Sequence, residues 1–195
     1  MKSALLLLIA AGAATAQNSD LGLLLGISWP SSQVIAGTQI RISGSAGVSG
    51  QINYARQLRE SSVGRLYLEL PLLLGARASG NSGNIISGSV HAGIYFTPGL
   101  RFNLTLHPRV SLYGTAGGGL ASFDQNGVTI SKSTVTVNTG WNNSFAGAFG
   151  GGLDFRLTRL ISLRGEVRDF VSAKGVGLTD GYNHLVVSFG MGFHW

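Results

Sequence analysis

The last twelve residues of the chain, His184 to Trp195 (HLVVSFGMGFHW), alternate between two kinds of side chain. One set is apolar and consists of Leu185, Val187, Phe189, Met191, Phe193 and Trp195. The other set is mostly small or polar. A period of two predicts a β-strand with one apolar face. We expect lipid to cover that face, because a closed β-barrel keeps every backbone hydrogen bond satisfied inside a membrane.

The first sixteen residues have the organisation of a secretory signal peptide. Lys2 supplies a short basic region, Ala4–Ala11 is apolar, and Ala14–Ala16 forms a small-x-small cleavage site. The apolar run is shorter than the roughly 20 residues that a membrane-spanning helix needs. The sequence therefore predicts a signal peptide over residues 1–16 and a mature domain over residues 17–195.

The composition favours an exported membrane protein over a soluble one. The chain has no cysteine, 30 glycines and only 11% charged residues, which is little charge and much glycine for a soluble domain. Without Lys2 the mature chain has 13 basic and 8 acidic residues. This basic excess contains no run of lysine or arginine and follows an export signal, so we expect no nucleic-acid partner.

Eight alternating segments separated by turn-rich stretches cover the mature chain. They are Leu21–Ser28, Ala46–Arg56, Arg65–Gly75, Gly88–Asn103, Val110–Phe123, Ser144–Leu157, Ile161–Val171 and the C-terminal segment. Their connections alternate between long and short, which is typical of outer-membrane barrels with long outer loops and short periplasmic turns. The expected fold is all-β: an eight-stranded antiparallel up-and-down transmembrane β-barrel.

Two prolines fall inside the expected strands. A closed barrel has no edge strand on which a residue without an N–H is easily tolerated. We therefore expect Pro71 and Pro98 to lie at bulges or where a strand leaves the membrane. A bulge at Pro98 would reverse the facing of the residues beyond it.

Charged residues occupy one face of several strands. An arginine or lysine that faces lipid near the membrane centre costs about 2–4 kcal/mol, so alternation predicts that these charges face the lumen. The expected lumen cluster consists of Glu69, Asp154, Arg156, Arg164, Glu166 and Arg168. A three-residue turn at Thr158–Leu160 would place Asp154 directly opposite Arg164. Paired charges can fill a small barrel, line a narrow polar pore or serve catalysis, and the structural filling is favoured.

Other motifs do not indicate a catalytic, cofactor or metal site. The triplets Gly117–Gly119 and Gly150–Gly152 lie within strands, without the following helix or lysine of a phosphate-binding loop. The four histidines form no metal-ligand motif. His184 and Ser188 share one face of a strand but stand roughly 13 Å apart. We predict no catalytic residue, no cofactor and no metal.

Aromatic and basic residues mark the expected ends of the strands. Tryptophan and tyrosine concentrate where a barrel meets the membrane surface. The predicted interface aromatics are Trp29, Tyr54, Trp141, Phe193 and Trp195. The short turns carry Arg56, Arg59, Arg65, Arg109 and Arg159. These arginines suit contact with lipid headgroups or with an anionic periplasmic partner.

Four segments carry a resemblance to a known family: LYLELPLLLGAR, PRVSLYGTAGGGL, GGGLDFRLTRLISLRGEVRDF and the terminal FGMGFHW. In order and spacing they resemble the small eight-stranded outer-membrane β-barrels of Gram-negative bacteria, the group of the OmpA, OmpX and OmpW barrels. The resemblance covers nearly the whole mature chain. The chain departs from the family at its last residue, which is tryptophan, whereas phenylalanine is commoner at that position in the family.

The resemblance implies a location and partners. They are the cell outer membrane, its lipid and lipopolysaccharide, and the barrel-assembly machinery that recognises the C-terminal strand, with a monomer as the expected state. In that family Asp154, Arg164, Glu166 and Arg168 would match interior polar residues.

The sequence leaves three hypotheses for function. The first is a non-enzymatic outer-membrane barrel with a charge-plugged lumen and a structural or surface role, or minor permeation. The second is a barrel enzyme acting on lipid or lipopolysaccharide. The third is a secreted soluble barrel that binds an apolar ligand, which requires apolar residues inside and polar residues outside.

Overall fold

A computed structural model describes residues 19–30, 33–34, 41–42, 46–80, 88–124, 127–131, 134–138, 140–174 and 180–195. The predicted signal peptide, residues 1–16, lies outside the described residues. Among the residues that the structure describes, no helix is long and apolar enough to cross a membrane.

The main sheet contains nine segments joined by antiparallel pairing. They are β1 (Ser19–Pro30), β4 (Gly47–Glu60), β5 (Arg65–Gly80), β6 (Gly88–Phe96), β7 (Gly99–His107), β8 (Val110–Asp124), β11 (Trp141–Arg156), β12 (Ile161–Lys174) and β13 (Asp180–His194). β6 and β7 are two parts of one long strand, because both pair with β5 on one side and with β8 on the other. Pairing of β1 with β13 closes the sheet into a barrel of eight strands.

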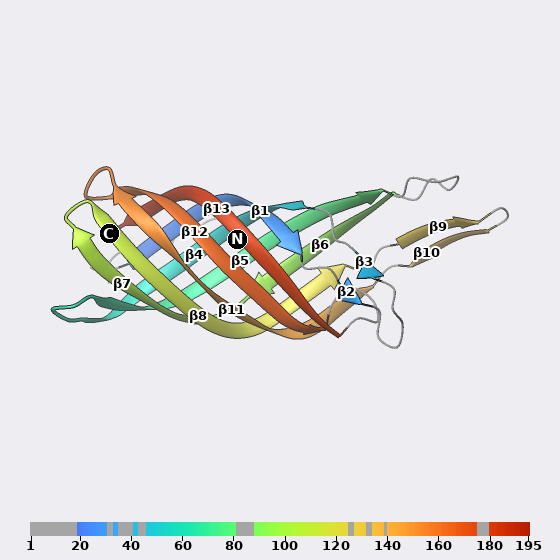
Figure 1. Ribbon diagram of the computed structural model, residues 1–195, viewed down its shortest axis with the longest axis horizontal. Helices are drawn as coiled ribbons and strands as arrows, with labels where there is room; N and C mark the ends of the chain where they lie inside the picture. The colour runs from blue at the N-terminus through green and yellow to red at the C-terminus, as the bar shows by residue number, and fades with distance from the viewer. Residues whose placement is uncertain are drawn as a thin grey trace, which may run out of the picture.

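The two ends of the barrel differ (Figure 1). Short turns join the strands at one end, on the left of the view, and the long connections leave from the other. The long connections include two small hairpins, β2 (Gln33–Val34) with β3 (Arg41–Ile42) and β9 (Gly127–Ser131) with β10 (Thr134–Asn138). Ser19 and Trp195 exchange backbone hydrogen bonds of 2.9 and 3.1 Å, so the barrel begins and finishes at the turn end. In outer-membrane barrels the short turns face the periplasm.

The period of two in the sequence determines which side chains face out. On β13, Leu185, Val187 and Phe189 are exposed, whereas Val186 and Ser188 are buried. The same alternation holds along β4, whose exposed Ile52 and Tyr54 flank the buried Asn53. The outer surface is therefore apolar and the lumen largely polar, which is the opposite of the soluble-barrel hypothesis.

Of the two expected places for Pro71 and Pro98, the bulge is found at neither, and that part of the prediction was wrong. Pro71 lies within β5, and Pro98 lies in the short interruption between β6 and β7. The register of β5 is the same before and after the interruption, from Leu72 opposite Phe96 to Glu69 opposite Gly99. The facing of the residues beyond Pro98 is therefore not reversed.

The prolines fit into the ladder because each lacks only the backbone N–H donor and keeps its carbonyl acceptor. The carbonyl of Pro71 accepts a hydrogen bond from the Thr97 N–H at 3.4 Å, and that of Pro98 accepts one from the Gly118 N–H at 3.0 Å. Register shifts within the described ladders occur instead at Gln57/Arg59 and at Thr105/His107. Both shifts lie beside turns, where the strands already leave the ladder.

Candidate functional site

Arg164 is the centre of an ionic network in the lumen near the turn end. Its Nε lies 2.6 Å from Asp154 Oδ1 and its Nη2 lies 2.9 Å from Asp154 Oδ2. The same guanidinium reaches Asp20 from the other side, at 3.0 Å through Nη1 and 2.8 Å through Nη2. Arg101 Nη2 lies 3.0 Å from Asp20 Oδ2. Two carboxylates thus hold one arginine in paired contacts, and Asp154 stands directly opposite Arg164 in the ladder, as the three-residue turn predicts.

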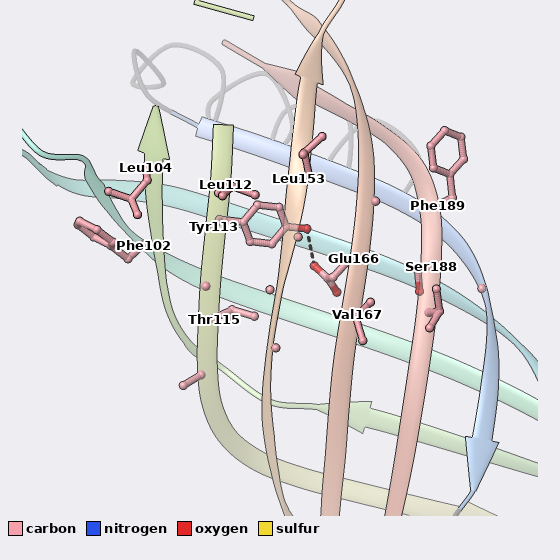
Figure 2. A pocket seen from close by; sticks show the side chains of 18 of the residues that line it. Phe102, Leu104, Leu112, Tyr113, Thr115, Leu153, Glu166, Val167, Ser188 and Phe189 are labelled. Carbon is pink, nitrogen blue, oxygen red and sulfur yellow. Dashed lines mark hydrogen bonds between the residues drawn. The ribbon is translucent and has the colours of Figure 1, made fainter. Parts of the chain in front are cut away.

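A second network is centred on Arg168 and Glu166. Arg168 Nη2 donates to Glu69 Oε2 at 3.1 Å and to Glu166 Oε2 at 2.9 Å. Glu166 also accepts hydrogen bonds from Gln51 Nε2 at 2.6 Å and from Tyr113 Oη at 2.8 Å, and Figure 2 shows Tyr113 and Glu166 pointing toward each other. The Glu166 carboxylate is therefore surrounded by donors from three strands, β4, β8 and β12.

The two networks are joined. Arg101 Nη1 lies 3.6 Å from Glu69 Oε1, so Arg101 links Asp20 in the first network to Glu69 in the second. Its guanidinium carbon also lies 4.8 Å from the centre of the Tyr67 ring and 5.4 Å from that of Tyr113. These are cation–π distances, and the two aromatic rings surround the charge with apolar carbon.

The lumen toward the loop end is apolar. A buried cluster there consists of Leu73, Tyr95, Ala121, Phe123, Ala146, Ala148, Phe170 and Val186. The Tyr95 ring packs edge-on against Phe123, with centroids 5.4 Å apart, and lies 5.1 Å from Phe170. The Tyr95 hydroxyl also contacts His184 Nδ1. We call this cluster the aromatic layer and the two joined networks the charged layer. Side chains of both layers fill the lumen in series.

The charged layer is nearly neutral and almost inaccessible to solvent. It contains four carboxylates (Asp20, Glu69, Asp154, Glu166) and three guanidiniums (Arg101, Arg164, Arg168), and each of these seven residues is at most 5% exposed. Isolated charges at such burial would be very costly, so every member depends on its partners. The arrangement suits a rigid filling held together by complementary charge.

The structure brings five of the six predicted lumen residues into the charged layer: Glu69, Asp154, Arg164, Glu166 and Arg168. Arg156 stands apart. It is half-buried and lines a cavity of about 20 Å³ at the turn end, next to Asp154 and Ser162. Its place on the last residue of β11 explains this, because the lumen is open to solvent there.

Sequence reasoning missed Asp20 and Arg101. The first expected strand began one residue too late for Asp20, although Asp20 continues the alternation of Gly22 and Leu24. Arg101 was not predicted as a lumen residue because a bulge at Pro98 was expected to reverse the facing of the residues after it. Carrying one register through the proline would have placed Arg101 in the lumen with Tyr95.

Comparison with known proteins decides the family. A family model described as the outer membrane protein beta-barrel domain matches residues 3–194. The chain belongs to this family. It is thus an outer-membrane barrel, located in the outer membrane. No curated protein sequence matches the chain.

Solved structures with the same fold have diverse roles. Neisserial surface protein A aligns at a TM-score of 0.61 and 12% identity, over 92% of this chain and 98% of that one. Ail, the attachment invasion locus protein of Yersinia pestis, aligns at 0.54 and 13% identity, over 91% and 99%. The outer membrane protease OmpT from Escherichia coli aligns at 0.55 and 9% identity, over 91% and 96%. Such identities show a shared fold, so the role must be argued from the site.

The predicted interface aromatics lie at both ends of this outer-membrane barrel. Trp29 lies near the loop end of β1 and is 44% exposed, and Trp195 lies at the turn end and is 42% exposed. Tyr54 also faces outward, and its hydroxyl hydrogen-bonds Ser19 Oγ at 3.3 Å. Phe193 is half-buried. The side chain of Trp141 falls outside the described ones. Their role as a membrane belt stays a prediction.

At the turn end, Ser162, His194 and Asp20 form a chain of contacts in the order found in serine hydrolases. Ser162 Oγ lies 2.9 Å from His194 Nε2, and His194 Nδ1 lies 3.1 Å from Asp20 Oδ2. However, Ser162 is fully buried, and the adjoining cavity of about 20 Å³ has room for about one water molecule. Asp20 already binds Arg101 and Arg164. The arrangement cannot admit an acyl substrate, and it ties the C-terminal strand to the charged layer.

A shallow groove of about 1270 Å³ crosses the outer surface of the barrel from β7 over β8, β11, β12 and β13 to β1. Glycines form part of its floor: Gly114 pairs with Gly151, and Gly165 pairs with Leu153. Figure 2 shows apolar side chains around it, among them Phe102 and Phe189. In an outer-membrane barrel this surface faces lipid, so the acyl chains of the bilayer cover it.

Proposed function

We propose that this protein is a non-enzymatic outer-membrane barrel with a sealed lumen and a structural or surface role. The observation that carries the proposal is the filling of the lumen by two different layers, one charged and one aromatic. Water and ions crossing the barrel would have to displace the Arg164 and Arg168 networks and then the packed Tyr95, Phe123 and Phe170 rings. A lumen filled in this way makes the barrel rigid, and the rigid barrel supports the long connections at the loop end.

The enzymatic hypothesis has less support from the site. Enzymes and non-enzymes share this fold, as OmpT and Neisserial surface protein A illustrate. In this chain the buried carboxylates are bound by arginines, and the Ser162 hydroxyl has no access for a substrate. These features favour a structural role over catalysis on lipid or lipopolysaccharide.

The proposal predicts that the mature protein does not conduct ions. After reconstitution into planar lipid bilayers, we expect no stepwise current, because the two layers leave no continuous water path. A general porin in the same bilayers serves as the positive control. Reproducible steps whose size changes in an Arg168→Gln variant would show conduction through the lumen and would replace a sealed barrel with a narrow polar pore.

A further inference from the structure

The turn end of the barrel is strongly basic, both on its outside and at the mouth of the lumen. Arg56, Arg59 and Arg65 flank the β4–β5 turn, Arg109 lies in the β7–β8 turn, and Arg156 and Arg159 flank the β11–β12 turn. The one exposed carboxylate among the described residues of these turns is Glu60, which lies 2.9 Å from Arg65 Nε. The hydrogen bond from Arg65 lowers the pKa of Glu60, so this carboxyl is ionised and paired at neutral pH.

This end therefore accounts for a surplus equal to the whole net charge of the mature chain. Six arginines against one glutamate leave five positive charges, and the mature chain has 13 basic and 8 acidic residues in all. The charged layer inside the lumen, in contrast, nearly cancels itself. The excess charge of the protein thus lies around the rim that faces the periplasm.

The same turns expose aliphatic side chains. They are Leu58 at 55%, Val63 at 67%, Leu106 at 62%, Leu157 at 52% and Leu160 at 61% exposure. Each of the three turns contains at least one of them together with at least one arginine. In water, so much exposed aliphatic surface is unfavourable. At a lipid surface the aliphatic groups contact acyl chains while the arginines reach the headgroups.

The choice of basic residue points to phosphate as the bound group. All six residues are arginine and none is lysine. The guanidinium presents a planar fork of donors that fits two phosphate oxygens at once, which the lysine ammonium cannot match. A carboxylated polymer such as peptidoglycan would satisfy the charge but would leave the leucines and the valine in water.

We propose that an arginine–leucine rim, comprising the four exposed arginines Arg56, Arg59, Arg109 and Arg159 and the five aliphatic residues named above, binds the phosphates of anionic phospholipids in the leaflet next to the turns. The rim gathers these lipids around the periplasmic end of the barrel and fixes the depth of the barrel in the membrane. The proposal rests on the outer-membrane location and is independent of whether the lumen is sealed.

The test compares lipid retention by rim variants. The mature protein is folded into vesicles of phosphatidylethanolamine with a minor share of phosphatidylglycerol and then extracted in mild detergent, and the retained lipids are quantified by mass spectrometry. One variant replaces Arg56, Arg59, Arg109 and Arg159 with glutamine. A matched variant replaces the same four with lysine, which keeps the charge. Arg65 and Arg156 are left in place, because Arg65 is paired with Glu60 and Arg156 lines the cavity beside Asp154.

We expect wild type to retain phosphatidylglycerol in excess of its share in the vesicles. In the glutamine variant this excess should fall by about fivefold or more, because a single basic residue near an anionic surface already raises the affinity for that surface about fivefold. The lysine variant should keep part of it. If the glutamine variant does not fold, as judged by its band shift on unheated gels, Arg109→Gln and Arg159→Gln are measured singly, each with the same expected direction.

Two outcomes would overturn the proposal. Equal phosphatidylglycerol retention by wild type and the folded glutamine variants would show that the arginines do not select the lipid. Arginine-dependent sedimentation of the protein with purified peptidoglycan, without phosphatidylglycerol enrichment, would assign the rim to a carboxylated polymer instead.

Discussion

Replacing Arg164 with methionine is expected to lower the free energy of unfolding by about 3–5 kcal/mol, the usual cost of removing one partner from a buried ion pair. Arg164 is fully buried and makes paired contacts with both Asp20 and Asp154. The substitution would leave Asp154 without its guanidinium and Asp20 with only Arg101 and His194 as partners. The fraction of protein that keeps its folded gel mobility across a urea series in lipid vesicles measures the change.

Two further variants separate the lost charge pairing from lost packing. The first is a triple variant that combines Arg164→Met with Asp20→Asn and Asp154→Asn. It removes the uncompensated carboxylates and should recover much of the stability. In vesicles without anionic lipid, Arg159→Met, in an exposed turn position, should change stability by less than about 0.5 kcal/mol. An Arg164→Met protein as stable as wild type, or a triple variant no better than the single one, would show that the charged layer does not support the fold.

Replacing Gly190 with valine is expected to prevent closure of the barrel. Gly190 lies on the inner face of β13, opposite Leu24 of β1. A Cβ built at this position overlaps the backbone carbonyl of Leu23 and lies 2.7 Å from the Leu24 Cα. Because both are backbone atoms of the closing strand, no rotamer change relieves the clash. We expect the variant to show no folded band on unheated gels of the outer-membrane fraction.

Gly165→Val is the matched control for Gly190→Val. Gly165 lies on the outer face of β12, and a Cβ there meets no atom within 4 Å. Valine also suits a strand better than glycine, so this variant should fold as well as wild type. Folding of Gly190→Val with an unchanged band shift would mean that β1 and β13 do not approach as closely as the closed barrel requires.

Alternation along the chain predicted the strands and their facing because the side-chain period of a strand is strictly two. It also predicted the Asp154–Arg164 pair, since a short turn fixes the register of neighbouring strands. Arg101 was lost to an expected bulge at Pro98, yet a proline that loses only a donor leaves the ladder in register. Local pattern thus suffices where a turn connects the partners.

Contacts across the lumen could not be predicted in the same way. The approach of Arg168 to Glu69, and of Arg101 to Asp20, joins strands that do not pair, and it depends on the curvature of the closed sheet. The aromatic layer formed by Tyr95, Phe123 and Phe170 is a product of the same curvature. Alternation gives the facing of each residue but not which inward side chains meet.

The most direct test of the closed barrel is a disulfide between its first and last strands. The chain has no native cysteine, so Leu25→Cys with Phe189→Cys introduces one possible pair. These residues stand opposite each other on β1 and β13 and both face outward, at a separation that a disulfide can span. In the outer-membrane fraction under mild oxidant, we predict an intrachain crosslink, detected by mass spectrometry of the joined peptides. Leu25→Cys with Phe193→Cys, four residues out of register, should not crosslink. Absent or equal crosslinking in the two variants would contradict closure of the barrel by β1 and β13.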